Sequence, residues 1–175
     1  NDMKMFNFSE ARSLKLKEVM GYDKHRIVKD KVCVSDLAIH GLKHLFNTGS
    51  LAKDDFDSLL VVTQSPDHFI PGTSSVIQGE LELKEDLLCM DITQGCAGYV
   101  VGLMQAFMLL QQPSINKVVL INGDVLSRKV SIHDRNSFPL IGDALSITVI
   151  ENKDSDKVYA NIKMDGRGRD ALVIP

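Results

Sequence analysis

Five short runs rich in hydrophobic residues constrain the fold of this chain more than any other feature. The first three runs are almost continuously apolar. That pattern is typical of a strand buried on both faces, because a half-exposed strand would alternate with polar residues. The runs predict strands at residues 57–63, 86–92, 117–122 and 144–151, followed by 158–164, where the alternation is looser. We therefore expect a sheet that is covered on both sides.

Helical patterns fill the segments between these strands. We expect helices at residues 3–20, 35–46, 74–79 and 97–111. The segment 97–111 is apolar around most of its circumference, which predicts a helix in the middle of the protein. Helices that alternate with short buried strands imply an α/β fold with a largely parallel sheet, and the length suits one domain over residues 1–175.

Composition and charge exclude several classes of function. The formal net charge of −3 gives no electrostatic basis for nucleic-acid binding. No apolar run approaches the roughly 18–20 residues that a membrane span requires, and the first eight residues lack the pattern of a signal peptide. The three cysteines match no zinc motif and suggest no disulfide framework. We therefore expect a cytoplasmic protein that binds neither metal nor membrane.

The junction between the second strand and the long apolar helix carries the strongest chemical signal. The junction reads Gly-Cys-Ala-Gly at residues 95–98. Cys96 would lie near a helix N-terminus, where unpaired N–H groups and the helix dipole favour a thiolate over a thiol. The same N–H groups would be placed to stabilise the oxyanion of an acyl transfer. We therefore predict that Cys96 is a catalytic nucleophile.

A structural role for Cys96 is the alternative, because free cysteine is among the residue types most often buried. The small residues on both sides favour a reactive turn instead, since they let a substrate approach the backbone closely. Cys89 alternates with hydrophobic residues inside a predicted strand and is expected to belong to the core. Cys33 lacks surroundings comparable to those of Cys96.

Four motifs, in the same order along the chain, resemble the β-ketoacyl-acyl-carrier-protein synthase III family. The segment Gln-Gly-Cys-Ala-Gly-Tyr at 94–99 is similar to the nucleophile turn of that family. The other three motifs lie at 62–71, at 122–128 and at 134–143. The resemblance implies the nucleophile-bearing half of a thiolase-like fold, with a mixed, mostly parallel sheet flanked by helices. The match covers only the first half of the family's members, and their second half has no counterpart in this chain.

The resemblance also implies a reaction, which is decarboxylative Claisen condensation in fatty-acid or related biosynthesis. The cysteine would accept an acyl group from a coenzyme A or carrier-protein thioester, and malonyl-acyl carrier protein would supply the carbanion. These thioesters are substrates, so no cofactor is expected. A His and an Asn that assist decarboxylation lie in the second half of the family, so only Cys96 carries over as catalytic. Acyl carrier protein and a second copy in a homodimer are the implied partners.

Three further positions match family residues with substrate-binding roles. Arg135 matches an arginine that lies against the adenine of coenzyme A, and Leu126 matches a residue that lines the acyl pocket. Ile70 matches a residue that reaches the acyl pocket of the neighbouring subunit. The alternatives are a solvated loop cation for Arg135 and ordinary packing for Leu126 and Ile70.

Departures from the family pattern keep other functions open. The stretch 15–21 lacks the Trp and Arg with which the strongest family type grips coenzyme A, and this favours a carrier-protein donor. An acyltransferase of the same fold that needs no decarboxylation is one alternative. A truncated fragment or dimerisation module without chemistry is another. His40 and His44 have a spacing that suits a metal, but they lack a third ligand, so we expect a solvated helix face.

Overall fold

The computed structural model describes residues 6–29, 31–153 and 157–171. Its strands form one sheet of the described residues, in the order β2-β1-β3-β4. The strands are β1 (Ser58–Val62), β2 (Leu88–Ile92), β3 (Lys117–Asp124) and β4 (Ala144–Glu151). Strands β1, β2 and β3 run parallel, and β4 pairs with β3 in the antiparallel direction. The expected mixed, mostly parallel sheet is confirmed.

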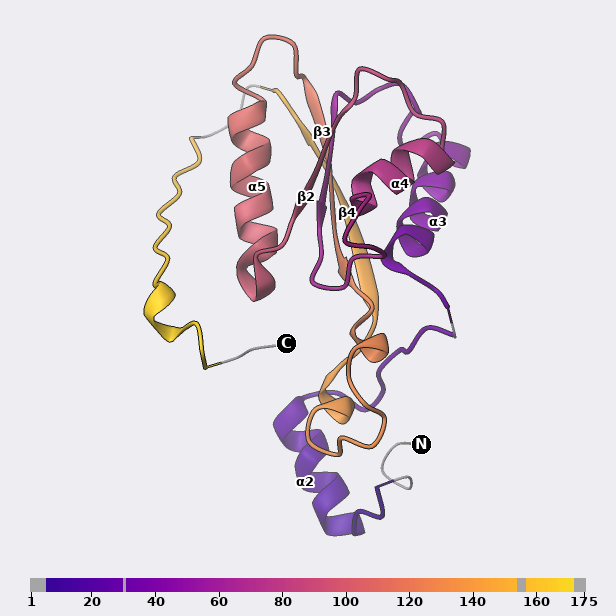
Figure 1. The fold of residues 1–175 in the computed structure, drawn as a ribbon, viewed down its shortest axis with the longest axis vertical. Coiled ribbons are helices and arrows are strands. Elements are labelled where there is room, and N and C mark those ends of the chain that lie inside the picture. Colours follow the sequence, from indigo (N-terminus) through magenta and orange to yellow (C-terminus); the bar gives the residue numbers. More distant parts are fainter. Residues whose placement is uncertain (1–5, 30, 154–156, 172–175) are drawn as a thin grey trace.

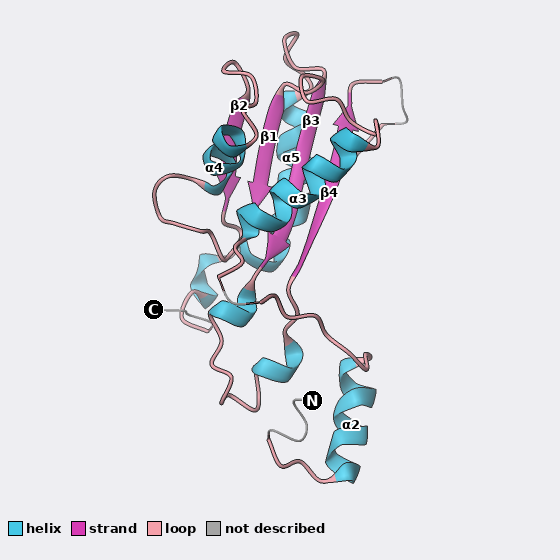
Figure 2. Ribbon diagram, turned by 90° about the vertical axis from the view of Figure 1, so that its right-hand side faces the viewer, coloured by secondary structure: helices cyan, strands magenta, loops and turns pink. Residues whose placement is uncertain are grey.

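Helices cover both faces of this sheet, as the α/β prediction requires. The helices are α2 (Glu10–Met20), α3 (Val34–Asn47), α4 (Thr73–Glu80) and α5 (Gly98–Leu109). Figure 1 shows α5 along one face and α3 and α4 along the other, with α2 beyond the sheet. Figure 2 shows α3 crossing in front of the strands and α5 behind them. No described helix is long and apolar enough to cross a membrane.

The fifth predicted strand, at residues 158–164, is wrong. These residues form no strand, and every side chain from 157 to 171 is exposed. Val158 is 64% exposed and Tyr159 is 87% exposed. An alternating segment gains stability as a strand only when it pairs with an edge and buries its apolar side, and this segment does neither.

The sheet carries two apolar layers, one on each face. Leu59, Val61 and Val119 point into the layer beneath α3 and α4, where they meet Leu42 and Ile77. On the other face, Leu60, Val118 and Leu120 pack with Ala106 of α5. Most of these side chains are fully buried, so truncating one of the leucines to alanine would cost about 2–5 kcal/mol of stability.

Within the described residues, helix α5 is buried only on the side that faces the sheet, so the burial expected from its apolar pattern is not complete in this part of the protein. Its buried residues are Gly98, Gly102 and Ala106, which share the side that faces the sheet. Val100 is 61% exposed and Met108 is 55% exposed. An apolar pattern shows which surfaces could be covered, but it does not show whether the described residues cover them.

Glycines let α5 approach the sheet closely. A methyl group on the α-carbon of Gly98 would lie 2.5 Å from Cγ1 of Val62. A methyl group on Gly102 would lie 2.8 Å from Cδ1 of Leu120 and 2.9 Å from Cγ2 of Val62. Carbon atoms prefer separations of about 3.5–4.0 Å, so neither position has room for a larger residue. The start of α5 is therefore fixed against the end of β1.

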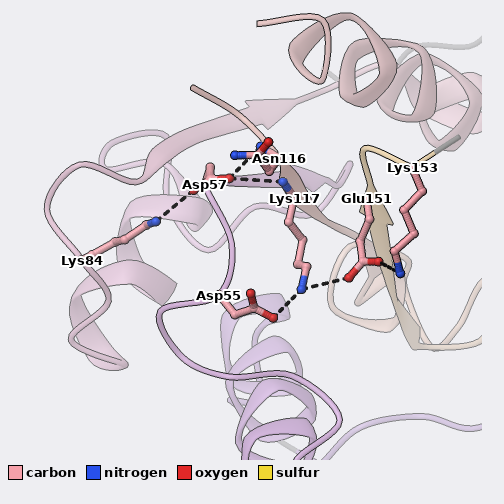
Figure 3. A network of polar contacts seen from close by, with 7 residues as sticks. All are labelled: Asp55, Asp57, Lys84, Asn116, Lys117, Glu151 and Lys153. Atoms are coloured by element: carbon pink, nitrogen blue, oxygen red, sulfur yellow. Dashed lines mark hydrogen bonds and ion pairs between the residues drawn. The ribbon is translucent and has the colours of Figure 1, made fainter. Parts of the chain in front are cut away.

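A polar network joins strands β1 and β3 at their amino ends (Figure 3). Asp57 precedes β1, and its Oδ2 accepts hydrogen bonds from the backbone N–H groups of Asn116 (2.8 Å) and Lys117 (3.2 Å). Lys84 Nζ lies 3.1 Å from Asp57 Oδ1. These contacts, led by the Asn116 N–H, hold the pKa of Asp57 below its usual value. The carboxylate therefore fixes where the two strands begin.

The same network extends to β4 through Lys117. Its ammonium group contacts the carboxylate of Asp55 and lies 2.9 Å from Oε1 of Glu151. These partners, Asp55 first, raise the pKa of Lys117. Glu151 is also paired with Lys153, and its two lysine partners, Lys153 first, lower its pKa to about 2. The network thus links β1, β3 and β4 at the end of the sheet where the parallel strands begin.

Candidate active site

The carboxyl ends of the three parallel strands lie together at one end of the sheet. Ligands bind at this end in open α/β sheets. Cys96 follows β2 and lies in a short 3-10 helix, η1 (Gly95–Ala97). Helix α5 begins at the next residue, and the Cys96 side chain is exposed. The predicted location at a strand-to-helix junction is confirmed, while the catalytic role of Cys96 stays a prediction.

Two glycines shape the turn around Cys96. Gly95 has a φ of +57°, in the left-handed region that favours glycine. The Gly98 N–H donates a hydrogen bond to the carbonyl of Gly95, which closes the turn over the cysteine. Gly98 also packs closely against the Val62 side chain, and this contact holds one end of the turn against β1. Cys96 is therefore held on a tight, accessible corner at the start of a twelve-residue helix.

The other two cysteines have different surroundings. Cys89 lies within β2, where it is half-buried against the core, as predicted. Burial, followed by the nearby charge of Asp91, raises the pKa of the Cys89 thiol, so this residue is a poor nucleophile. Cys33 precedes α3, and its sulfur lies 2.6 Å from Nη1 of Arg128.

Asp124 organises the carboxyl edge, although the sequence analysis did not single it out. It ends β3, and its Oδ1 accepts hydrogen bonds from Oγ1 of Thr63 (2.9 Å) and from the backbone N–H of Gln64 (2.6 Å). The same oxygen accepts from the N–H (3.1 Å) and hydroxyl (3.0 Å) of Ser65. One carboxylate therefore fixes the path of the chain as it leaves β1.

Two further aspartates hold loops at the same edge. The carboxylate of Asp91 accepts the backbone N–H groups of Thr73 (2.5 Å) and Ser74 (2.8 Å), which begin helix α4. Asp143 is 7% exposed and accepts the backbone N–H groups of Val28 (2.9 Å) and Ser127 (3.0 Å). An acidic residue within an apolar run, or two residues after one, is the sequence signal that could have found Asp91 and Asp124.

The predicted substrate-binding residues lie on separate loops at this edge. Leu126 is half-buried in a 3-10 turn that follows β3. Ile70 is 89% exposed in the loop between β1 and α4, and Arg135 is exposed in the loop between β3 and β4. In Figure 1 the loop between β3 and β4 extends below the sheet toward α2. The structure thus gathers the loops at one edge, and the substrate-binding roles stay predictions.

The histidines of α3 show no metal site. His40 and His44 are both exposed, in agreement with a solvated helix face. Within the part of the chain that the structure describes, no three His, Cys, Asp or Glu side chains are grouped so that they could hold a metal ion.

Comparison with known proteins gives consistent matches. Residues 90–168 match the family described as 3-oxoacyl-[acyl-carrier-protein (ACP)] synthase III. A putative 3-oxoacyl-[acyl-carrier-protein] synthase 3 of Campylobacter jejuni is 36% identical over 168 residues, which are 95% of this chain and 47% of that protein. A β-ketoacyl-[acyl-carrier-protein] synthase III of Clostridium perfringens is 31% identical over 142 residues, 80% of this chain and 44% of that protein.

Solved structures agree with these sequence matches. The crystal structure of a 3-oxoacyl-(acyl-carrier protein) synthase from Burkholderia xenovorans superposes with a TM-score of 0.80 at 28% identity. The superposition covers 89% of this chain and 44% of that one. A structure of Xanthomonas campestris OleA superposes with a TM-score of 0.66 at 18% identity over 85% of this chain and 49% of that one, and it shows the fold alone. The chain spans about half the length of the relatives it matches.

Proposed function

We propose that this chain, which is similar to the amino-terminal half of β-ketoacyl-acyl-carrier-protein synthase III, contributes the acyl-accepting thiol of an acyl-condensing enzyme. The observation that carries the proposal is the exposed position of Cys96 on a glycine-shaped corner between β2 and α5. A nucleophile at such a corner is accessible to a thioester on one side and lies beside helix N–H groups on the other.

In the proposed first step, the Cys96 thiolate attacks the carbonyl carbon of an acyl thioester. A new carbon–sulfur bond forms, the bond to the leaving thiol breaks, and the departing thiolate takes up a proton. Negative charge develops on the carbonyl oxygen in the transition state, and backbone N–H groups at the start of α5 are the available donors. The product of this step is an acyl-Cys96 thioester.

In the proposed second step, malonyl-acyl carrier protein loses carbon dioxide, and the resulting carbanion attacks the acyl-Cys96 thioester. A carbon–carbon bond forms and the Cys96 thiolate leaves. The His and Asn that assist decarboxylation in this family would be supplied by a second half like the one its relatives possess. Acyl carrier protein is therefore the proposed partner, and a homodimer in the cytoplasm is the proposed setting. A second half would also cover the exposed outer side of α5.

The proposal gives roles to three further residues. Leu126 would line the acyl chain, Arg135 would contact the adenine end of a coenzyme A donor, and Ile70 would reach a neighbouring subunit. The high exposure of Ile70 is compatible with that contact, because an exposed apolar side chain gains from burial at an interface. The absence of the family's Trp and Arg at residues 15–21 favours a carrier-protein donor over free coenzyme A.

A transfer reaction without decarboxylation uses the same cysteine and is the second candidate function. It shares the acyl-Cys96 intermediate, but an alcohol or amine would accept the acyl group. Release of carbon dioxide from malonyl-acyl carrier protein separates the two reactions, because only condensation requires it. The third candidate, a module without chemistry, predicts no acyl group on any cysteine.

Mass spectrometry after incubation with an acyl-carrier-protein thioester and, separately, an acyl-coenzyme A tests the proposal. A longer protein that includes a second half like that of the relatives is tested alongside the chain described here. We expect the peptide that contains Cys96 to gain the mass of the acyl group, and hydroxylamine to remove it. Cys89→Ser is the matched control that should keep the adduct, whereas Cys96→Ser should lose it. An unmodified Cys96 with both donors and both proteins would exclude the proposed function.

A further inference from the structure

Gln64 lies beside the turn that carries Cys96. It is an exposed residue that leaves β1 two positions after Val62. A methyl group on the α-carbon of Gly95 would lie 3.6 Å from the side-chain oxygen Oε1 of Gln64. Gly95 directly precedes Cys96, so the Gln64 carboxamide borders the backbone of the nucleophile turn.

Asp124 holds the Gln64 side chain in this orientation. Its Oδ2 accepts a hydrogen bond from Nε2 of Gln64 at 3.4 Å, while its Oδ1 accepts the Gln64 backbone N–H at 2.6 Å. Because a carboxylate is only an acceptor, the amide end of the side chain must face Asp124. The oxygen end is therefore the part that faces Gly95.

The support behind Gln64 is rigid. Thr63 and Ser65, on either side of it, are 2% and 6% exposed and are both bonded to Asp124. The Thr63 N–H also donates to the carbonyl of Ile92, the last residue of β2, at 3.2 Å. The Asp124 carboxylate thus fixes the end of β1, and through Thr63 the end of the strand from which the Cys96 turn departs. Hydrogen bonds to a charged group are stronger than neutral ones, which suits this supporting role.

We propose that Gln64 is a positioning residue that holds the Gly95–Cys96 turn in place through its link to Asp124. The inference rests on the proposed role of Cys96 as a nucleophile, although it does not depend on the acyl donor. Gly95 has no side chain of its own and a left-handed backbone, so its position depends on the groups that border it. Removal of the Gln64 carboxamide therefore frees the turn without disturbing the core.

Alkylation of the cysteines by iodoacetamide tests this role without any acyl substrate. The rate at each cysteine is followed by peptide mass spectrometry from about pH 6 to 9, a range that spans thiol ionisation. We expect Gln64→Ala to change the rate of Cys96 alkylation about three- to tenfold, because that rate depends on how the turn presents the sulfur to the reagent. Gln64→Asn keeps the amide on a shorter side chain and should fall between the wild type and Gln64→Ala. The Cys33 rate in the same molecules is the internal reference and should not change.

Gln111→Ala is the matched control, since Gln111 is also an exposed glutamine and lies beyond the opposite end of α5. Equal Cys96 rates in Gln64→Ala and Gln111→Ala would overturn the inference. So would an equal change in the rates of Cys33 and Cys96, which would indicate a general loss of structure. If Cys96 alkylates as expected in this series but accepts no acyl group, the proposed function fails and the positioning role stands. If Cys96 is acylated and the Gln64 variants react like wild type, only the positioning role fails.

Discussion

The contact between Gly98 and Val62 predicts that Gly98→Ala destabilises the protein, although alanine is the better helix former. The new methyl group would lie 2.5 Å from Cγ1 of Val62, about 1 Å inside the preferred separation of carbon atoms. Val62 is 4% exposed and its side chain is stiff, so it has little freedom to move aside. Overpacking of this kind costs about 1–3 kcal/mol.

The gain in helix propensity from glycine to alanine offsets only part of that cost. It is about 1 kcal/mol in a helix interior and is smaller at the first residue of a helix. We therefore expect Gly98→Ala to lower the free energy of unfolding by about 1–2 kcal/mol. Urea unfolding followed by circular dichroism measures the difference.

Gly79→Ala is the matched control for this experiment. Gly79 lies in α4, and a methyl group there would meet no atom within 4 Å. Its φ is not in the left-handed region, so only the propensity gain remains, and we expect stabilisation by about 0.5–1 kcal/mol. A Gly98→Ala protein as stable as the wild type would refute the close packing of α5 against β1.

Three further outcomes follow from the structure. The Thr73 hydroxyl is buried and has no hydrogen-bond partner among the described residues, so Thr73→Val should raise the free energy of unfolding by about 1 kcal/mol in urea unfolding. Because the pKa of Asp57 is depressed in the folded state, its contribution is present above the unfolded value of about 4 and is lost as the pH falls through the folded value. Asp57→Asn should therefore be less stable at neutral pH and lose stability less steeply under acid than the wild type, as measured by urea unfolding at stepwise lower pH. Leu120→Ala should cost about 2–5 kcal/mol in the same assay, and a cost below that of Gly98→Ala would contradict the packing beneath α5.

The alternation of apolar strands and helices was enough to predict the α/β fold, because burial on both faces leaves a clear pattern in the sequence. The runs around Leu60 and Leu120 became buried parallel strands as expected. The run around Met90 also became a parallel strand, but it lies at the edge of the sheet and is only partly buried, so its predicted burial on both faces was wrong. The segment 158–164 misled the prediction because an alternating pattern does not reveal whether a sheet edge is within reach. The pattern of α5 likewise could not show that Val100 and Met108 would remain exposed among the described residues.

The candidate site was predictable where one short segment carries it, and hidden where distant segments meet. Cys96 could be placed at a strand-to-helix junction because the strand, the glycines and the helix are contiguous. Asp124 and Gln64 are sixty residues apart, and only the pairing of β1 with β3 brings them together. Nothing in the sequence near Gln64 indicates which carboxylate binds it.

The central claim is that Cys96 is the accessible nucleophile of this chain. The most direct test is the number of acyl groups bound by variants in which one cysteine at a time is replaced by serine. Intact mass is measured for Cys33→Ser, Cys89→Ser and Cys96→Ser after exposure to the same acyl-carrier-protein thioester. One acyl group per chain on the first two variants and none on Cys96→Ser is the predicted result. An acyl group retained by Cys96→Ser, or missing from all three variants, would contradict the account.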